Sequence, residues 1–372
     1  MKKPTYILGI ESSCDDTAAS VIKVTLLNKS NFNIKAKILA NIVKNQSTLH
    51  EDFGGVVPEI AARAHTERLD KSVKQALVES NLTIKDISSI AVTSGPGLIG
   101  GLLSGIMFAK GLSKGLGIPL IGVNHLAGHC LSPKLSENID FPYLLLLVSG
   151  GHCQFIIVKS YDKFQRIGGT LDDAPGEAFD KVARILGLAY PGGPEVEKCA
   201  LLGSPSRFKM PRPLIDRPDC NLSFSGLKTA LRNQLDLLIK EKGGITLKDR
   251  SDLCSAFQGA VCDVLEKKSM LAIDFFLKSN NFQPSTLAVA GGVASNSQIR
   301  QSLEKTAKKF DFKFSAPPNE LCTDNAAMIA FAGAKKYFKK SFDPSDLIPK
   351  PRWPLDMLAA PLNGSGKRGR KS

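Results

Sequence analysis

Two histidines four residues apart are the clearest chemical feature of this sequence. His125 and His129 lie in the segment HLAGH, in a chain that has 5 histidines. On an α-helix, positions i and i+4 share one face, so both rings could bind one metal ion. The spacing is similar to that of the zinc-peptidase motif H-E-x-x-H, but Leu126 stands where the general base would be. Leucine cannot accept a proton, so the pattern argues against peptide hydrolysis. Two hydrogen-bonded core histidines remain the alternative.

A third metal ligand would have to come from another segment. Asp324 lies in CTDNAAMIA, at the start of a predicted helix that follows Pro317 and Pro318. Its carboxylate could complete the site, or it could only cap the helix, which is the commoner role of an acidic residue there.

Three predicted loops follow apolar strands and contain small residues or glycines. Glycine lets backbone N–H groups approach a phosphate closely, although none of these loops is a Walker A or G-x-G-x-x-G motif. The three loops are residues 11–17 (ESSCDDT), 148–152 (VSGGH) and 290–296 (AGGVASN). Three such loops at matching places favour the layout of actin, sugar kinases and Hsp70.

The first loop offers Ser12 and Ser13 as possible phosphate contacts. Asp15 and Asp16 would repel a phosphate unless a cation or a water molecule lies between them and it. The loop therefore stays a candidate whose chemistry depends on what else is bound.

The elements that would position these residues repeat along the chain. Strands are predicted by short apolar runs, and helices by longer periodic segments. We expect strands at 6–11, 18–26, 34–43, 90–93, 119–123, 143–148, 154–159 and 286–290, and helical segments at 57–79, 98–116, 178–188, 224–279 and from 296 onward. This order predicts an α/β fold of two lobes, each a βββαβα subdomain, with a central cleft.

The expected domains follow from this repeat. They are an N-terminal lobe at 1–124, a C-terminal lobe at 125–340 with a cap insertion near 202–250, a segment at 341–358 that packs back on the first lobe, and a disordered basic tail at 359–372.

The net charge of +14 and the pI near 9.3 favour a polyanionic partner such as nucleic acid, although a basic proteome would also explain them. The 8 cysteines are scattered and form no C-x-x-C pair, which predicts free thiols in a reducing compartment, the cytoplasm. Residues 88–109 carry no charge, but glycines interrupt them, so we expect a buried strand and helix and no membrane span.

The chain resembles the TsaD (Gcp) family of tRNA threonylcarbamoyladenosine synthases, in its bacterial form. The matching segments are GIESSCDDTAAS, GGVVPEIAARAH, SGPGLIGGLLSG, GVNHLAGH, LLLLVSGGH, DDAPGEAFDKVARILGLAYPGGP, LSFSGLKTA, AGGVASN and CTDNAAMIA, which extend to about residue 355.

The resemblance implies transfer of a threonylcarbamoyl group from threonylcarbamoyl-AMP to N6 of adenine 37 in tRNAs that read ANN codons, with release of AMP. It implies one divalent metal, iron(II) or alternatively zinc, on His125, His129 and Asp324. The implied substrate contacts are Val148, Ser149, Gly150, Gly151, His152, Asp180, Gly193 and Asn296. The implied partners are tRNA, through its anticodon loop, and the proteins TsaB and TsaE, while TsaC makes the adenylate.

Other functions are weighed against this one. An ATPase or sugar kinase of the same superfold would explain the loops but not HLAGH, and Leu126 argues against a metallopeptidase. A nucleotide-binding scaffold would not need an intact set of metal ligands. A mitochondrial location is the alternative to the cytoplasm, but no arginine-rich presequence precedes Tyr6.

Overall fold

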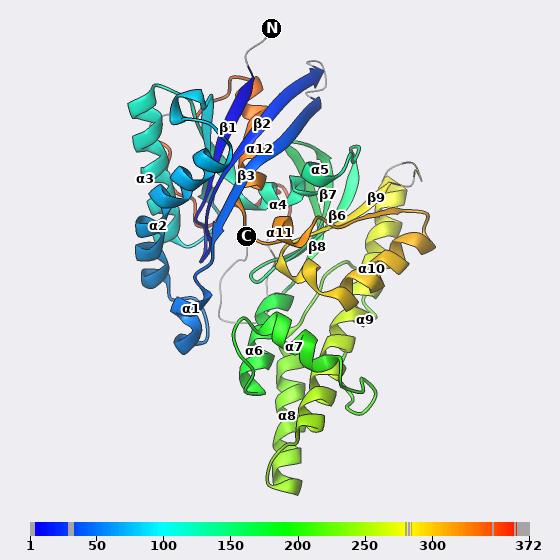
Figure 1. Cartoon of the computed structure of the whole chain (residues 1–372). Coiled ribbons are helices and arrows are strands. Elements are labelled where there is room, and N and C mark those ends of the chain that lie inside the picture. The colour runs from blue at the N-terminus through cyan, green and yellow to red at the C-terminus, as the bar shows by residue number, and fades with distance from the viewer. Residues whose placement is uncertain are drawn as a thin grey trace. The chain divides into compact units, whose positions relative to one another are not determined.

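Figure 1 shows the computed structural model of the chain. The structure describes residues 4–28, 33–279, 281, 283, 285–343, 346–360 and 362. The basic tail expected at 359–372 thus lies almost wholly outside the described residues. None of the described helices has the length and apolar character that a membrane span requires.

The described residues form two compact units, and each is described by itself. The first consists of residues within Met1–Asn138 and Thr323–Met357, and the second of residues within Ile139–Cys322 and Leu358–Lys371. These divisions differ from the boundaries expected at 124/125 and 340/341. The reason is the helix that follows Asp324, which packs on the strands of the first sheet and also on the short helix that carries HLAGH, so both helices belong to the first unit.

The first unit is built on a five-stranded sheet with the order β3-β2-β1-β4-β5. Strands β1, β4 and β5 are parallel, whereas β2 is antiparallel to both of its neighbours. Its strands are β1 (Thr5–Glu11), β2 (Thr17–Asn28), β3 (Asn33–Lys44), β4 (Ser89–Gly95) and β5 (Leu120–Asn124). Its helices are α1 (Ser47–His50), η1 (Glu51–Phe53), α2 (Pro58–Glu79), η2 (Ile84–Asp86), α3 (Ile99–Leu116), α4 (His125–Leu131), α5 (Pro133–Ser136) and α12 (Ala326–Phe338).

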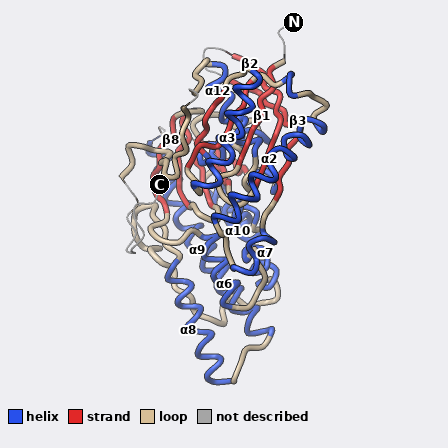
Figure 2. The backbone as a smooth tube through the Cα atoms, turned by 90° about the vertical axis from the view of Figure 1, so that its left-hand side faces the viewer, coloured by secondary structure: helices blue, strands red, loops and turns tan. Residues whose placement is uncertain are grey.

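Helices α2 and α3 lie in front of the strands of this sheet in Figure 2, and α12 packs on the same strands from the other face. Leu8 and Ile10 of β1 belong to a buried apolar cluster with residues of α2 and α3. Successive residues of a strand face opposite sides of the sheet, so Gly9 faces the side away from α2 and α3. A Cβ on Gly9 would lie 2.1 Å from the carbonyl oxygen of Ala326. The backbone of α12 therefore packs directly against the backbone of β1 on this side of the sheet.

The segment after α12 returns along the same sheet. The N–H of Gly122 donates to Asp343 Oδ2 (2.9 Å), and the N–H of Lys350 donates to the carbonyl of Ser94 (2.7 Å). The N–H of Asp343 also donates to Leu120 O (3.0 Å). This segment therefore satisfies some of the backbone hydrogen-bonding groups that the edge strand β5 would otherwise leave unpaired.

The second unit repeats the topology of the first. Its sheet has the order β10-β9-β6-β7-β8, in which β6, β9 and β10 are parallel. Its strands are β6 (Tyr143–Val148), β7 (Cys153–Ser160), β8 (Lys163–Gly169), β9 (Thr286–Ala290) and β10 (Lys313–Ser315). Its helices are α6 (Pro175–Ile185), α7 (Gly192–Ala200), α8 (Ser225–Lys242), α9 (Leu247–Ser279), η3 (Gly292–Ser295), α10 (Ser297–Lys309) and α11 (Asn319–Cys322). The matching strand orders confirm the predicted duplication of a βββαβα subdomain.

Helix α9 forms the centre of the second unit. Residues of β6, β7, α6, α8 and α10 join it in one buried apolar cluster. The helical stretch expected at 224–279 is in fact two helices, because Gly243 adopts a left-handed conformation (φ 74°) at the end of α8.

Helix α3 supplies a direct test of close packing in the first unit. A Cβ on Gly101 would lie 2.3 Å from the carbonyl oxygen of Ser12, whereas a Cβ on Gly111 meets no described atom within 4 Å. We expect Gly101→Ala to lower the free energy of unfolding by about 1–3 kcal/mol, because backbone must move to admit the methyl group.

Gly111→Ala is the matched control in the same helix. It gains helix propensity and should raise the free energy of unfolding by up to about 1 kcal/mol. Chemical denaturation of both variants measures the difference, and equal free energies of unfolding would contradict the close packing.

Candidate functional site

The carboxyl ends of three parallel strands bring the first group of polar residues together. Strand β1 ends at Glu11, and β4 carries Thr93 next to Val92, which pairs with Ile10. Strand β5 ends at Asn124, immediately before His125. In open α/β sheets this edge is where ligands bind, because the loops and helices that follow the strands all start there.

Helix α4 fixes both histidines on one face. Its cap is Asn124, whose Oδ1 accepts hydrogen bonds from the N–H groups of Leu126 (2.9 Å) and Ala127 (3.3 Å). The amide group of Asn124 donates to the carbonyl of Trp353 (3.1 Å), which ties the cap to the returning segment. His125 and His129 are buried, one turn apart.

Asp324 precedes α12 but does not cap it. The cap is Asn325, whose Oδ1 accepts from the N–H of Met328 (3.0 Å). Helix α4 packs closely on α12, since a Cβ on Gly128 would lie 2.9 Å from Ile329 Cδ1. The capping role weighed for Asp324 therefore belongs to its neighbour.

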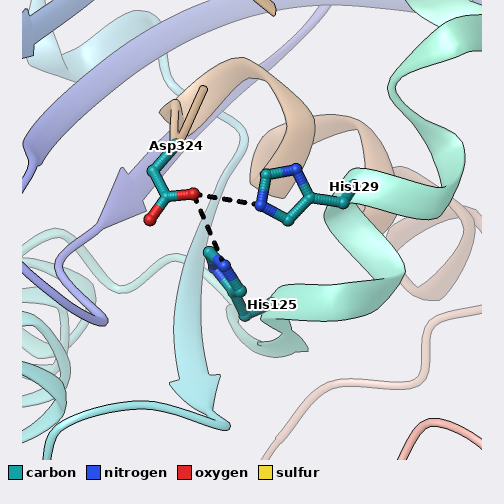
Figure 3. A group of neighbouring side chains, drawn as sticks. All are labelled: His125, His129 and Asp324. Atoms are coloured by element: carbon teal, nitrogen blue, oxygen red, sulfur yellow. Dashed lines mark hydrogen bonds and ion pairs between the residues drawn. The ribbon is translucent and has the colours of Figure 1, made fainter. Parts of the chain in front are cut away.

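The two histidines and Asp324 converge (Figure 3). Asp324 Oδ1 lies 3.0 Å from His129 Nε2 and 3.6 Å from His125 Nε2. One potential ligand atom from each residue falls within 4.8 Å of the other two. Two imidazole nitrogens and one carboxylate oxygen at this spacing fit a single divalent metal ion with coordination positions left for substrate.

A buried carboxylate that the sequence analysis did not single out lies behind His125. Glu11 Oε2 is 2.9 Å from His125 Nδ1 and 2.6 Å from the hydroxyl of Thr93, which donates to it. Glu11 Oε1 accepts from the N–H of Ser13 (2.6 Å). Only the position of a glutamate at the end of an apolar strand could have pointed to it.

The pKa values reflect this clustering. Burial alone would lower the pKa of His125, but the carboxylates of Glu11 and Asp324 outweigh it and raise that pKa to about 9. Burial would raise the pKa of Glu11, but the charge and hydrogen bond of His125 lower it instead. The two side chains thus form a buried ion pair.

The loop after β1 is held by protein contacts. The Ser12 hydroxyl donates to Gly101 O (3.0 Å), and Ser13 O accepts from the N–H of Leu98 (2.7 Å). The Ser13 hydroxyl lies 3.1 Å from His125 Nδ1. Both serines predicted as phosphate contacts therefore already have partners within the first unit.

The acidic part of this loop faces the same centre. Burial and then the charge of Asp324 raise the pKa of Asp15, and the same two causes raise that of Asp16 to about 8. Asp16 also accepts a hydrogen bond from Asn45 Nδ2 (2.9 Å). A region this rich in negative charge favours a cation over a directly bound phosphate.

In the second unit, residues 148–152 form a tight turn between β6 and β7. Val148 is buried, the N–H of Ser149 donates to His152 O (2.8 Å), and the N–H of His152 donates to Ser149 Oγ (3.1 Å). The carbonyls of Ser149 and Gly150 accept from the first turn of α6, at Gly176 (3.3 Å) and Glu177 (3.2 Å). Gly150 and Gly151 are exposed at the tip of the turn.

Asp180 and Gly193 lie where α6 meets α7. Asp180 Oδ1 accepts from the N–H of Gly192 (2.8 Å), which orients the start of α7. A Cβ on Gly192 would lie 2.5 Å from Ala183 Cβ, so only glycine fits there. A Cβ on Gly193 would meet no described atom within 4 Å, so the space beside it is open.

Asn296 caps α10 on the loop that follows β9. Its Oδ1 accepts from the N–H of Ile299 (3.0 Å), and its Nδ2 donates to Gln258 Oε1 (2.8 Å). The next residue, Ser297, donates to Glu197 of α7 (2.7 Å from its N–H). The loops after β6 and β9 also touch, because a Cβ on Gly291 would lie 2.4 Å from Val148 O. The predicted substrate contacts therefore gather around α6, α7 and α10 of the second unit.

Comparison with known proteins identifies the family. The model of the TsaD family, described as tRNA N6-adenosine threonylcarbamoyltransferase, matches residues 37–331. The chain belongs to the TsaD family. It is 56% identical over its full length to the tRNA N6-adenosine threonylcarbamoyltransferase of Ruegeria sp. (strain TM1040), and 55% identical to that of Cereibacter sphaeroides (strain ATCC 17023), with each relative also covered in full. Membership places the chain among the acyltransferases that modify tRNA.

A solved structure with low sequence identity shares the fold alone. HypF from T. kodakarensis superposes with a TM-score of 0.56 at 14% identity, over 93% of this chain and 49% of that protein. Together with the two matching sheets, this supports the predicted actin-like, Hsp70 and sugar-kinase superfold.

Asp180 allows a test of its structural contact. Asp180→Ala removes the acceptor for the Gly192 N–H and should lower the free energy of unfolding by about 0.5–2 kcal/mol, the usual cost of losing a helix cap. Asp180→Asn keeps an acceptor oxygen, so it should lower the free energy of unfolding by less. Chemical denaturation compares them with Asp236→Ala, an exposed aspartate of α8 in the same unit that should change little. If Asp180→Ala unfolds like the unmutated protein, the contact does not stabilise α7.

Proposed function

We propose that the chain transfers the threonylcarbamoyl group of threonylcarbamoyl-AMP to N6 of adenine 37 in tRNAs that read ANN codons, with AMP as the leaving group. The observation that carries the proposal is the convergence of His125, His129 and Asp324 in a chain of the TsaD family. Each of these residues sits in a segment that resembles the family's motifs.

The reaction asks the protein mainly to bind and orient its substrates. The donor is a mixed anhydride and is already activated, so no nucleophilic side chain is required. Burial, followed by nearby Asp15, raises the pKa of Cys14 well above its usual value, which makes the thiol beside the site a poor nucleophile. The N6 amine of adenine is weakly nucleophilic, so positioning should supply much of the rate acceleration.

A divalent metal on these ligands would supply Lewis acidity and an anchor for oxygen atoms of the threonylcarbamoyl group. Two histidines and one carboxylate are the donor set typical of non-haem iron(II) sites, so we assign iron(II), with zinc as the alternative.

The loops of the second unit are the proposed adenylate contacts. The N–H groups of the exposed Gly150 and Gly151 are candidate donors to the phosphate or to the developing oxyanion. Val148, Ser149 and His152 shape that turn. We assign Gly193 and Asn296 to the adenosine part and Asp180 to a ribose hydroxyl group.

The net charge of +14 supports tRNA as the second substrate, because lysine and arginine attract its phosphates. Base 37 lies in the anticodon loop, where a base can be splayed from the stack and held in a pocket. The 8 free cysteines support a reducing compartment, and we assign the cytoplasm.

A stripe on α3 supports TsaB as a protein partner, with TsaE as a further one. Ile99, Leu103 and Met107 are spaced four residues apart and are 50%, 43% and 59% exposed. Apolar side chains exposed along one helix face favour a protein contact, and we propose that TsaB covers them.

The alternatives have less support. A metallopeptidase would need a base at position 126, where the leucine is fully buried. An ATPase, a sugar kinase or a nucleotide-binding scaffold of the same superfold would share the sheets but would not need the two histidines and Asp324.

The transferase proposal is tested by supplying the purified protein with TsaB, TsaE, a TsaC-type enzyme, ATP, bicarbonate, labelled threonine and tRNA. We expect label in the tRNA. His125→Ala and His129→Ala should each reduce bound metal and lower transfer by at least about 100-fold, because each removes a ligand.

The control is Lys74→Ala, an exposed residue of α2, which should keep both metal and transfer. Circular dichroism checks that the variants fold. If the donor system is active and the tRNA stays unlabelled, the transferase proposal is wrong. If both histidine variants retain transfer, only the proposed role of the metal is wrong.

The TsaB contact is tested with Leu103→Glu. A charge in the apolar stripe should weaken TsaB binding at least about 100-fold, since burying an unpaired carboxylate is costly. Metal content should not change. Leu202→Glu, at a residue that is 77% exposed in the second unit, is the matched control. Unchanged TsaB binding by Leu103→Glu in calorimetry would place the contact elsewhere.

A further inference from the structure

We infer that Glu11 is a positioning residue that sets the tautomer and ring orientation of His125 for metal binding. The inference rests on the proposed metal centre and adds a residue to it. Glu11 itself points away from the ligand positions, since it contacts Nδ1 of His125, whereas Nε2 is the atom that faces Asp324.

The burial of Glu11 shows that its place is specific. The residue has no exposed surface, and an ionised carboxylate without water costs several kcal/mol unless it is paired. Three donors meet it: Ser13 N–H at 2.6 Å on Oε1, and Thr93 Oγ1 at 2.6 Å and His125 Nδ1 at 2.9 Å on Oε2. These bonds leave the carboxylate one orientation.

That orientation determines which nitrogen of His125 binds the metal. An ionised carboxylate only accepts hydrogen bonds, so Nδ1 must carry a proton. The lone pair available to a metal is then the one on Nε2, which lies 3.6 Å from Asp324 Oδ1. In metal sites, a carboxylate on the outer N–H of a histidine ligand fixes the ring and raises its basicity.

The second histidine provides an internal comparison. Nδ1 of His129 is buried and has no hydrogen-bond partner within the described part of the chain. His129 is held by packing on α12, by Asp324 and by an edge-to-face contact with the ring of His125, whose centroid lies 4.7 Å away. A change in the hydrogen bond of Glu11 should therefore appear first at Nδ1 of His125 and less at His129.

Metal affinity measures this role without an activity assay. Full-length protein is stripped of metal and titrated with Zn²⁺ against a chromophoric chelator. Glu11→Gln, which keeps the shape but removes the charge, should weaken binding about 10- to 100-fold, the usual cost of losing such a partner. Asp70→Asn, at a half-exposed carboxylate of α2 in the same unit, is the matched control and should bind zinc like the unmutated protein.

A second measurement separates positioning from general damage to the fold. In zinc-loaded protein with ¹⁵N-labelled histidine, the Nδ1–H proton of His125 should resonate downfield because of the carboxylate. Glu11→Gln should move this signal upfield and change the signals of His129 much less. Thr93→Val removes one of the donors that orient Glu11 without changing a charge, so it should also shift this signal, and it serves if Glu11→Gln does not fold.

The outcomes are distinct. Zinc affinity and His125 signals unchanged in a folded Glu11→Gln variant would overturn the role of Glu11 and leave the metal centre intact. Absence of zinc binding by the unmutated protein, or binding retained by His125→Ala, would overturn the metal centre and this inference with it.

Discussion

The parallel pairing of β1, β4 and β5 is the constraint on which the proposed metal centre depends. It brings three carboxyl ends to one edge, so that Glu11 meets Thr93 and His125, which lie 82 and 114 positions further along the chain. A shift of one residue in any of these strands would turn its side chains to the other face and break the cluster. Gly9 and Gly101 maintain the arrangement from outside, because they allow backbone contact with α12 and with the loop at Ser12.

The same edge concentrates negative charge in a region with little water. Burial, together with the negative charges of Asp324 and Asp15, raises the pKa of Asp16 to about 8. The pKa of His125 rises to about 9 because the nearby carboxylates stabilise its protonated ring. Burial is the largest cause of the Asp16 shift and the neighbouring carboxylates add to it, whereas the charges of Glu11 and Asp324 raise the pKa of His125 against the effect of burial. Carboxylates thus contribute to both shifts, and their negative charge favours a bound cation over a phosphate at the loop after β1.

The sequence predicted eight of the ten described strands, the duplicated subdomains and the two histidines on one helix face, because each leaves a local pattern. The outer strands β8 and β10 were not among the predicted strands. It also placed Asp324 at the start of a helix, but could not separate a ligand from a cap, since the choice depends on Asn325 one position later. Glu11 was missed because its partners, Thr93 and His125, lie far along the chain and only strand order brings them near. The unit boundary lies after α4 for a similar reason: α4 packs on α12, and a contact between distant helices has no signature in either segment.

The position of Glu11 also explains how a peptidase-like spacing serves acyl transfer. In an H-E-x-x-H site the glutamate follows the first histidine and reaches a metal-bound water as a base. Here that position holds the fully buried Leu126, and the carboxylate comes from β1 to the opposite nitrogen of the ring. This carboxylate is buried and bonded to Thr93 and Ser13, and it contacts Nδ1 of His125, whereas Nε2 is the nitrogen that faces Asp324. At position 126 the site thus lacks the base that an H-E-x-x-H site uses to activate water, which agrees with the proposed transfer from an activated anhydride donor to an amine.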